Sequence, residues 1–284
     1  MDILLEEYSA PDQLFVRHAV SDAPDDRYYT MHVHSECEIY LFLGGRCDYL
    51  VEGSRYPLER GSILIMRPGE SHRARILAPK QYERYVMNFP LSALDGTDPK
   101  RQLMTPFLNR PLGIGNLYSA GELPGLNAEQ VFQKMFREAE GYDRELAMRT
   151  GLVIFLDALN EAFRQREDPE SPEEGNISRR ILLYINAHLC EELSLNAIAE
   201  EFYISRSQLT RIVKDATGSP VWEYITVKRL ALAREKMLSG MTALRIAEEC
   251  GFGDYSSFYR AYVRHYGHSP RENSQTHTNR SVGS

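Results

Sequence analysis

The last third of the chain contains an internal repeat, and this feature constrains the fold more than any other. Residues 195–202 read Leu-Asn-Ala-Ile-Ala-Glu-Glu-Phe, and residues 244–250 read Leu-Arg-Ile-Ala-Glu-Glu-Cys. Ala199 and Ala247 occupy equivalent positions 48 residues apart. Because a sequence repeat indicates a repeated supersecondary unit, we expect an all-α domain of two similar units over residues 177–272.

Each copy has the pattern of a helix-turn-helix. In the first copy, Ser205 followed three residues later by Gln208 predicts the capped start of a second helix. In the second copy, Asp254 is the expected helix cap, and Gly251 lies in the turn, where a left-handed conformation suits glycine. We therefore expect two pairs of packed helices, each with one face of its second helix exposed.

The exposed faces of the two second helices carry side chains that suit DNA. Arg contacts guanine bidentately, and Ser or Thr contacts bases or phosphates. The predicted DNA-binding residues are Arg206, Ser207, Gln208, Thr210, Arg211, Lys214, Tyr255, Ser256, Ser257, Tyr259, Arg260 and Arg264. The alternative is a helical bundle that binds protein and carries Arg206 and Arg211 as solvated charge; the presence of two copies of the pattern weighs against it.

The net charge of −7 is distributed unevenly along the chain. Residues 177–284 contain 14 Lys and Arg against 11 Asp and Glu, whereas residues 1–176 contain 19 against 29. Phosphate repels the acidic part, so only the C-terminal part is a candidate nucleic-acid surface. One helix predicted over residues 219–238 is expected to hold the two units about one DNA turn, ~34 Å, apart.

Residues 11–90 have the pattern of a β-barrel or β-sandwich. Short runs rich in Val, Ile, Tyr and Phe are separated by Gly and Pro, which predicts many short strands. Gly44-Gly45 predicts a two-residue hairpin, and Gly53-Ser54 predicts a second tight turn. The expected strands cover residues 36–43, 46–52, 61–67 and 82–89.

Two amphipathic helices are predicted over residues 126–166. Asn127 and Gln130 resemble a capping box, and Gly141 is expected to separate the helices. The second helix carries an apolar stripe of Met148, Leu152, Phe155, Leu159 and Ala162. Because such a wide stripe can contact two surfaces, we expect a homodimer contact here; the alternative is that the helices only cover the barrel.

Residues 181–270 resemble the DNA-binding domain of the AraC/XylS family of transcriptional regulators. The resemblance depends on Tyr184-Ile185, residues 195–199, 205–214, 254–260 and 267–270, together with Gly218, Tyr224-Ile225, Arg229-Leu230, Ala233, Ile246-Ala247 and Gly251-Phe252. It implies that base contacts come from Ser207, Thr210, Arg211, Ser256, Ser257 and Arg260. Tyr203 departs from the family pattern, because glycine is frequent at this position of the first turn.

The N-terminal part resembles a cupin barrel. His32, His34 and Glu38 resemble the first cupin motif, and on a strand they would point to one face; the segment ending at His72 resembles the second motif. Imidazole and carboxylate groups suit Zn, Ni, Mn or Fe, so these four residues are candidate ligands of a divalent metal. In the alternative interpretation no metal is bound and a polar effector, such as a sugar, contacts these four residues with Tyr40 and Tyr49.

The sequence as a whole predicts an α+β multidomain protein. It has a cupin-like barrel over residues 1–125, a helical dimerisation segment over 126–166, an acidic linker over 167–176, a double helix-turn-helix domain over 177–272 and a disordered tail over 273–284. Residues 1–7 lack the pattern of a signal peptide, no long apolar segment indicates a membrane span, and the four cysteines are scattered. These features favour a reducing cytoplasm.

The predicted function is a dimeric regulator that binds promoter DNA and responds to a small polar effector, a carbohydrate or related metabolite. The family resemblance favours activation of catabolic genes, with RNA polymerase as a further partner. We expect no enzyme activity. Two alternatives remain: a barrel that serves only protein interaction or dimerisation, and a metal-dependent cupin enzyme joined to a DNA-binding domain.

Overall fold

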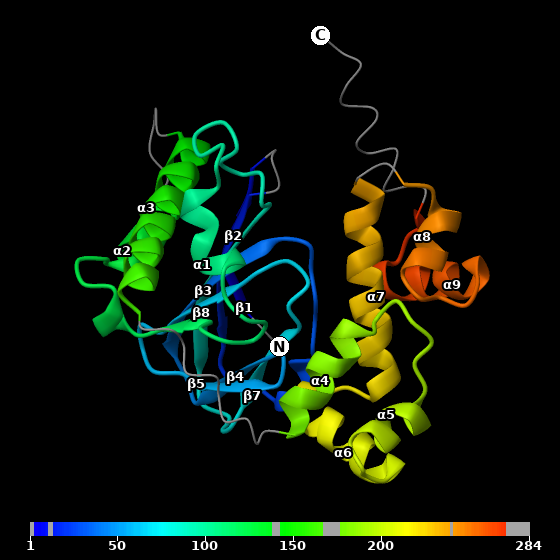
Figure 1. Ribbon diagram of the computed structural model, residues 1–284. Coiled ribbons are helices and arrows are strands. Elements are labelled where there is room, and N and C mark those ends of the chain that lie inside the picture. Colours follow the sequence, from blue (N-terminus) through cyan, green and yellow to red (C-terminus); the bar gives the residue numbers. More distant parts are fainter. Residues whose placement is uncertain (1–2, 11–13, 138–142, 167–176, 239–240, 271–284) are drawn as a thin grey trace. The chain divides into compact units, whose positions relative to one another are not determined.

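The computed structural model describes residues 3–10, 14–137, 143–166, 177–238 and 241–270. The expected linker, the expected tail and the predicted helix break at Gly141 lie outside these residues. The described chain forms two compact units, one based on residues 1–30 and 36–175 and the other on residues 31–35 and 176–284. Figure 1 shows that strands dominate the first unit and that the second is helical. This agrees with the α+β fold class predicted from the sequence.

Two antiparallel sheets form the first unit. The larger sheet has the strand order β1-β2-β8-β3-β6-β9 and the smaller has the order β5-β4-β7. The larger sheet consists of β1 (Ile3–Ser9), β2 (Phe15–Ser21), β8 (Tyr82–Phe89), β3 (Cys37–Gly44), β6 (Ile63–Met66) and β9 (Leu117–Tyr118). The smaller sheet consists of β5 (Ser54–Pro57), β4 (Cys47–Val51) and β7 (His72–Ile76).

Strand β3 divides the first unit into two cores because its side chains alternate between the two faces of the larger sheet. Tyr40 and Phe42 contribute to the core between the two sheets, which is the barrel interior. Ile39 and Leu41 contribute to the core on the opposite face, which the helices cover. The alternation therefore gives this sheet two buried faces, and β3 is buried along nearly its whole length.

The predicted hairpin at Gly44-Gly45 is wrong. Strand β3 pairs with β6 and β8, whereas β4 belongs to the smaller sheet, so the two glycines mark the crossing between sheets. Gly45 has φ 125°, and a Cβ on it would lie 3.2 Å from the carbonyl oxygen of Gln81. Close packing against the start of β8, rather than a hairpin turn, requires glycine here.

The second predicted turn is displaced by one residue. Val51 of β4 pairs with Ser54 of β5, which leaves Glu52 and Gly53 as the two loop residues. Both have positive φ, 47° and 81°, as the favoured two-residue hairpin requires. Ser54 is therefore the first residue of β5 rather than part of the turn.

Helices cover the outer face of the larger sheet (Figure 1). The side chain of Asn127 accepts a hydrogen bond from the Gln130 amide, 3.0 Å, and so caps α2 as predicted. A Cβ on Gly151 would overlap the Met135 side chain, so α2 and α3 pack closely at that point. The helices are α1 (Thr105–Leu108), α2 (Ala128–Phe136) and α3 (Arg144–Gln165), with short 3-10 turns η1 (Asp26–Tyr28), η2 (Gln102–Met104) and η3 (Ala120–Glu122).

The second unit contains the two predicted helix-turn-helix pairs. The first pair and its preceding helix share one core with α7, and the second pair shares another core with the same helix. Helix α7 has 18 residues, about 27 Å at 1.5 Å per residue. The helices are α4 (Ile177–Ala187), α5 (Leu195–Glu201), α6 (Arg206–Thr217), α7 (Val221–Leu238), α8 (Ala243–Glu249) and α9 (Tyr255–Tyr266).

Among the described residues, none of the helices has the length and apolar character required to cross a lipid bilayer.

Candidate DNA-reading surface and barrel site

Helix α6 begins with the predicted capping box. The Gln208 amide donates to Ser205 Oγ at 3.2 Å, and the Ser205 amide donates to Gln208 Oε1 at 2.9 Å. Leu209 and Val213 are buried and fix one face of the helix. The opposite face exposes Arg206, Ser207, Gln208, Thr210, Arg211 and Lys214. Each predicted contact residue of the first unit therefore lies on the solvent side of a helix anchored by its other face.

Helix α9 repeats this arrangement with a different cap. Asp254 Oδ1 accepts a hydrogen bond from the Ser257 amide at 2.7 Å. The hydrogen bonds that Asp254 accepts from the backbone and the side chain of Ser257 lower its pKa. Ser257 Oγ also donates to Asp254 Oδ2, so this hydroxyl is part of the cap. Arg260 and Arg264 are exposed, with Ser256 and Tyr259. Tyr255 is half-buried against Phe258, which places it at the rim of the surface.

The two turns have the same backbone hydrogen bond. The amide of Ile204 donates to the carbonyl of Ala199, and the amide of Phe252 donates to that of Ala247, both at 3.0 Å. Tyr203 has φ 53° and the equivalent Gly251 has φ 76°. The position that departs from the family pattern therefore adopts the left-handed conformation that glycine adopts in the second copy.

The four candidate metal ligands are divided between the two units, His32 and His34 in the second and Glu38 and His72 in the first. Within the first unit, His72 Nε2 of β7 lies 3.7 Å from Glu38 Oε2 of β3. His32 and His34 precede β3 instead of lying on it, because β3 begins at Cys37. A bend at residues 35–36 separates the two histidines from β3, so strand alternation does not relate them to Glu38, which corrects the sequence argument.

The predicted effector residues Tyr40 and Tyr49 are buried in the barrel interior, and burial raises the pKa of both phenols. The Tyr49 ring stacks beside His72, with centroids 6.1 Å apart. Tyr40 Oη lies 2.6 Å from Tyr82 Oη. These groups line a polar and aromatic interior next to His72.

Three polar residues of this interior were missed in the sequence analysis, all of them on β8. Tyr82 bonds to Tyr40, Arg84 lies over the Tyr82 ring at 4.4 Å, and Asn88 donates to Glu38 Oε2 at 3.0 Å. The period-two alternation of β8 contains the signal that would have found them, because positions 82, 84 and 88 share a face.

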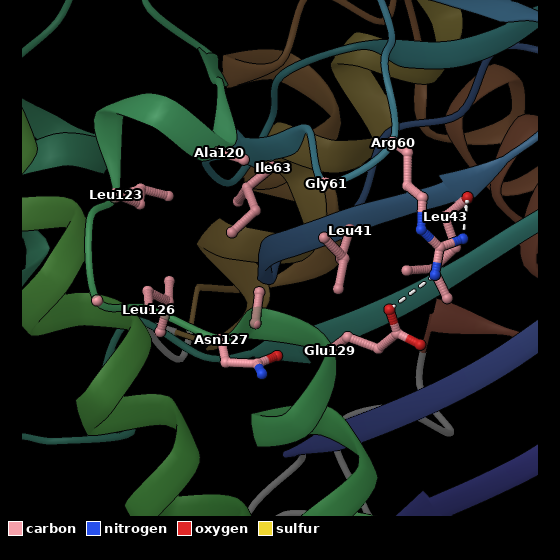
Figure 2. Close-up of a pocket in the computed structure, with 12 residues that line it drawn as sticks. Leu41, Leu43, Arg60, Gly61, Ile63, Ala120, Leu123, Leu126, Asn127 and Glu129 are labelled. Carbon is pink, nitrogen blue, oxygen red and sulfur yellow. Dashed lines mark hydrogen bonds and ion pairs between the residues drawn. The ribbon is translucent and has the colours of Figure 1, made fainter.

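A hollow lies outside the barrel, between the larger sheet and the segment that leads into α2. Its volume is about 450 Å³. Figure 2 shows apolar side chains around it, including Leu41, Ile63 and Leu126. At its edge, Arg60 donates to Glu129 at 2.8 Å and to the Leu43 carbonyl at 2.7 Å. The hollow is mainly apolar and carries a neutralised charge pair.

A buried ion pair joins the second cupin-like motif to a later segment. Both nitrogens at the tip of Arg110 donate to the Glu70 carboxylate, at 2.7 and 2.6 Å, and the Gly113 amide donates at 2.9 Å. Burial raises the pKa of Glu70, but the charge and hydrogen bonds of Arg110, with the Gly113 hydrogen bond, outweigh it and lower the pKa to about 2. This ion pair fixes the loop that precedes His72.

Comparison with known proteins covers both units. An AraC-like ligand-binding domain model matches residues 12–149, and a helix-turn-helix domain model matches residues 198–275. The HTH-type transcriptional activator RhaS of Salmonella paratyphi B is 33% identical over 247 residues, covering 85% of this chain and 86% of that protein. The uncharacterized HTH-type transcriptional regulator YfiF of Bacillus subtilis is 25% identical over 255 residues, covering 87% and 80%.

Two solved structures give weaker matches. ToxT from Vibrio cholerae has 14% identity and a TM-score of 0.40, covering 91% of this chain and 96% of that chain. The DNA-binding domain of AdpA, in complex with a target DNA, has 23% identity and a TM-score of 0.34, covering 37% and 97%.

Two capped helix-turn-helix units, joined in one chain to a ligand-binding domain, define a DNA-binding transcriptional regulator. The chain belongs to the AraC family of such regulators.

Proposed function

We propose that this protein controls transcription by binding promoter DNA with α6 and α9 and by binding a small polar effector in its barrel. The observation that carries the proposal is the equivalence of the two second helices. Each is capped, each is anchored by a buried face, and each exposes an arginine at the same position, Arg211 or Arg260. Helices of this kind enter the major groove and contact base edges.

The DNA-reading role is tested by replacing both arginines. The Arg211→Ala/Arg260→Ala variant should lose sequence-specific promoter binding, by about 1–3 kcal/mol for each lost bidentate contact, while remaining folded because both side chains are exposed. Arg17→Ala is the matched control, since it removes one exposed charge from the first unit. Gel-shift titration against specific and scrambled DNA distinguishes the outcomes. Unchanged discrimination between the two DNAs would refute the assignment.

We further propose that the effector is a sugar or a related polar metabolite that contacts His32, His34, Glu38, Tyr40, Tyr49 and His72. Imidazole, carboxylate and phenol groups suit a ligand rich in hydroxyls. An effector at a hundred times its Kd should stabilise the chain by about 2.7 kcal/mol, which raises Tm by roughly 5–10 °C. A thermal-shift panel of sugars tests this. A Glu38→Gln variant should lose the shift for the effector that wild type binds.

The proposal includes activation of catabolic genes through RNA polymerase, a cytoplasmic location and no enzyme activity. Its support is the similarity of the chain to RhaS, which is a transcriptional activator. In vitro transcription from a bound promoter tests it. Transcription should rise on addition of the protein and its effector, whereas a fall would identify a repressor.

We propose that α3 forms part of a homodimer contact. Leu146 and Ile154 are exposed, at 61% and 43%, and line a groove of about 410 Å³ beside Val131 of α2. Dimerisation allows one protein to occupy two half-sites. Leu146→Glu/Ile154→Glu should shift the sedimentation velocity toward monomer, whereas Leu77→Glu, which alters an exposed leucine next to β7, should not.

A second candidate role is a barrel that serves only protein interaction or dimerisation. The packing of large side chains such as Tyr40, Phe42 and Tyr82 in the barrel interior favours it. Under this role no sugar in the panel changes Tm, and the protein still binds promoter DNA.

A further inference from the structure

We propose that the first unit binds a linear diamine or polyamine in an acidic hollow between α3 and the segment before α1. The hollow has a volume of about 490 Å³, a size typical of small-molecule sites. Its lining includes Asp98 and Gln102 on one side and Asp157, Asn160, Glu161 and Arg164 of α3 on the other. None of these residues belongs to the core of the barrel interior, so the inference concerns a second ligand and goes beyond the proposed function.

The charges that line the acidic hollow favour a cation. Three carboxylates, of Asp98, Asp157 and Glu161, and one guanidinium, of Arg164, give the lining a net charge of −2. The three charged side chains of α3 are exposed and form no ion pair with any residue that the structure describes. Their charges are therefore available to a ligand, and the excess is negative.

Asn160 gives a second and independent indication of a ligand. It is the one buried residue of this lining, with 3% of its surface exposed. Its Oδ1 accepts no hydrogen bond from the described part of the chain. A buried amide oxygen without a donor destabilises the folded state, so an unsatisfied acceptor at this position needs an explanation. A ligand N–H in the hollow supplies the missing donor.

Both sides of the acidic hollow are held in place. On one side, Asp98 Oδ2 accepts a hydrogen bond from the Leu103 amide at 2.7 Å. Arg101 forms two hydrogen bonds of 3.0 Å with Asp95, so its charge is directed to that carboxylate rather than to Asp98. On the other side, Leu159 is buried in the core and anchors α3. The hollow is therefore formed before a ligand arrives.

The spacing of the carboxylates favours an extended cation over a metal ion. Ca²⁺ and Mg²⁺ need oxygen ligands that converge to about 2.0–2.6 Å from one point. Among the described residues, Asp98, Asp157 and Glu161 do not form a convergent group of this kind. Asp157 and Glu161 are four residues apart on α3, a rise of about 6 Å. Because an ammonium group donates up to three hydrogen bonds, two ammonium groups a few carbon atoms apart suit both carboxylates and Asn160.

The binding test uses the full chain and calorimetric titration. The probes are 1,4-diaminobutane, which has two ammonium groups, and butylamine, which has one. The expected result is saturable binding of one diamine per chain, with butylamine at least tenfold weaker. Absence of saturable binding, or equal affinities for the two amines, would overturn the proposal.

The first test variant is Asp157→Asn/Glu161→Gln. Both side chains are exposed, so the variant should fold, and its affinity for 1,4-diaminobutane should fall at least tenfold. The matched control is Asp22→Asn/Glu59→Gln, which removes two exposed carboxylates from other parts of the first unit and should leave the affinity unchanged. Equal weakening in the two variants would show that the diamine responds only to net charge, which would contradict the proposed site.

The second test variant, Asn160→Leu, separates a ligand-binding role from a structural one. The change removes a buried acceptor that has no donor among the described residues, so Tm of the free chain should stay the same or rise. Diamine affinity should nevertheless fall several-fold. A lower Tm with unchanged diamine affinity would show that Asn160 serves the fold alone and would count against the site.

The competing explanation is that a basic side chain of a second copy of the chain occupies the acidic hollow. In that case the diamine does not bind the wild-type protein, and Asp157→Asn/Glu161→Gln shifts the sedimentation velocity toward monomer. This pair of results would replace the diamine site by a contact between copies. Diamine binding together with unchanged sedimentation of the variant would support the proposal.

Discussion

The guanidinium of Arg229 donates a hydrogen bond from Nε to the carbonyl oxygen of Leu189 at 2.8 Å. A second bond, from Nη2 to the Glu191 carbonyl, also measures 2.8 Å. Arg229 lies on α7, is buried, and a Cβ on Gly251 would approach its guanidinium to 3.0 Å. One side chain therefore packs against the segment after α4 and against the turn of the second helix-turn-helix.

Replacement of Arg229 by alanine should lower the stability of the second unit. Arg229→Ala leaves the carbonyls of Leu189, which is buried, and Glu191 without these donors, and hydrogen bonds to charged groups contribute about 1.5–3 kcal/mol each. We expect the second unit to unfold at a clearly lower denaturant concentration. Trp222 on α7 is the only tryptophan in the chain, so its fluorescence reports on this unit. An unchanged denaturation midpoint would show that neither hydrogen bond of Arg229 contributes to the stability of this unit.

Gly251 should tolerate no side chain. It has φ 76°, and a Cβ on it would lie 2.8 Å from the Leu189 carbonyl oxygen. Gly251→Ala should cost about 1–2 kcal/mol for the left-handed backbone, and more for the overlap. The matched control is Gly253→Ala, since nothing lies within 4 Å of a Cβ there. Denaturation followed by Trp222 fluorescence should separate the two variants; equal effects would contradict the packing argument.

Replacement of Tyr203 by glycine should stabilise the second unit. It is 96% exposed and has φ 53°, so its side chain gains little from burial while its backbone is strained. Tyr203→Gly removes a left-handed cost of about 1–2 kcal/mol but adds unfolded-state entropy of about 0.5–1 kcal/mol. We expect a net gain of about 0.5–1 kcal/mol in the free energy of unfolding. Destabilisation by this change would indicate that the exposed ring makes a contact that offsets the strain.

The Glu70–Arg110 pair should make the first unit sensitive to acid. Because the pKa of Glu70 is lowered to about 2 from 4.5, its contribution to stability is complete above about pH 4.5 and is lost as the pH falls toward 2. Glu70→Gln should cost about 3–5 kcal/mol at neutral pH, since it leaves the Arg110 charge buried without a counter-charge. The Tm difference from wild type should then shrink between pH 4.5 and pH 2.

The control for acid sensitivity is Glu122→Gln. Hydrogen bonds with Ser119 and Arg166 lower the pKa of Glu122 against an opposing effect of burial, but its side chain is 42% exposed, so solvent screens the interaction. Its effect on Tm should be smaller at every pH. If both variants changed Tm equally, burial of the Glu70–Arg110 pair would not increase its contribution to stability.

Local patterns in the sequence were sufficient to predict the helices and turns of the second unit. Capping at Ser205 and Asp254 depends on residues three positions apart, and the left-handed turn at Gly251 depends on one residue. The repeat then supplied a second, independent instance of each signal. Strand β8 was predicted with its observed bounds for a similar reason, because aromatic and apolar residues recur along it and it ends at a proline.

Local patterns in the sequence did not predict which strands pair with one another when they lie far apart in the chain. Gly44-Gly45 has the local chemistry of a hairpin, yet β3 and β4 belong to different sheets, because β3 pairs with β6 and β8 instead. The same limit applies to Tyr82 and Arg84 of the barrel interior, whose partners are set by the register of β8 against β3.

The sequence by itself determined the two helix-turn-helix units and their exposed arginines, because caps, turns and helical faces depend on residues a few positions apart. Only the tertiary structure decided which strands share a sheet, where Arg229 forms its contacts, and that Glu70 pairs with Arg110. It also brought His72 to Glu38, which lies 34 positions earlier in the chain and in the other sheet. These contacts join distant parts of the chain, and burial and strand register, which no local pattern encodes, fix them.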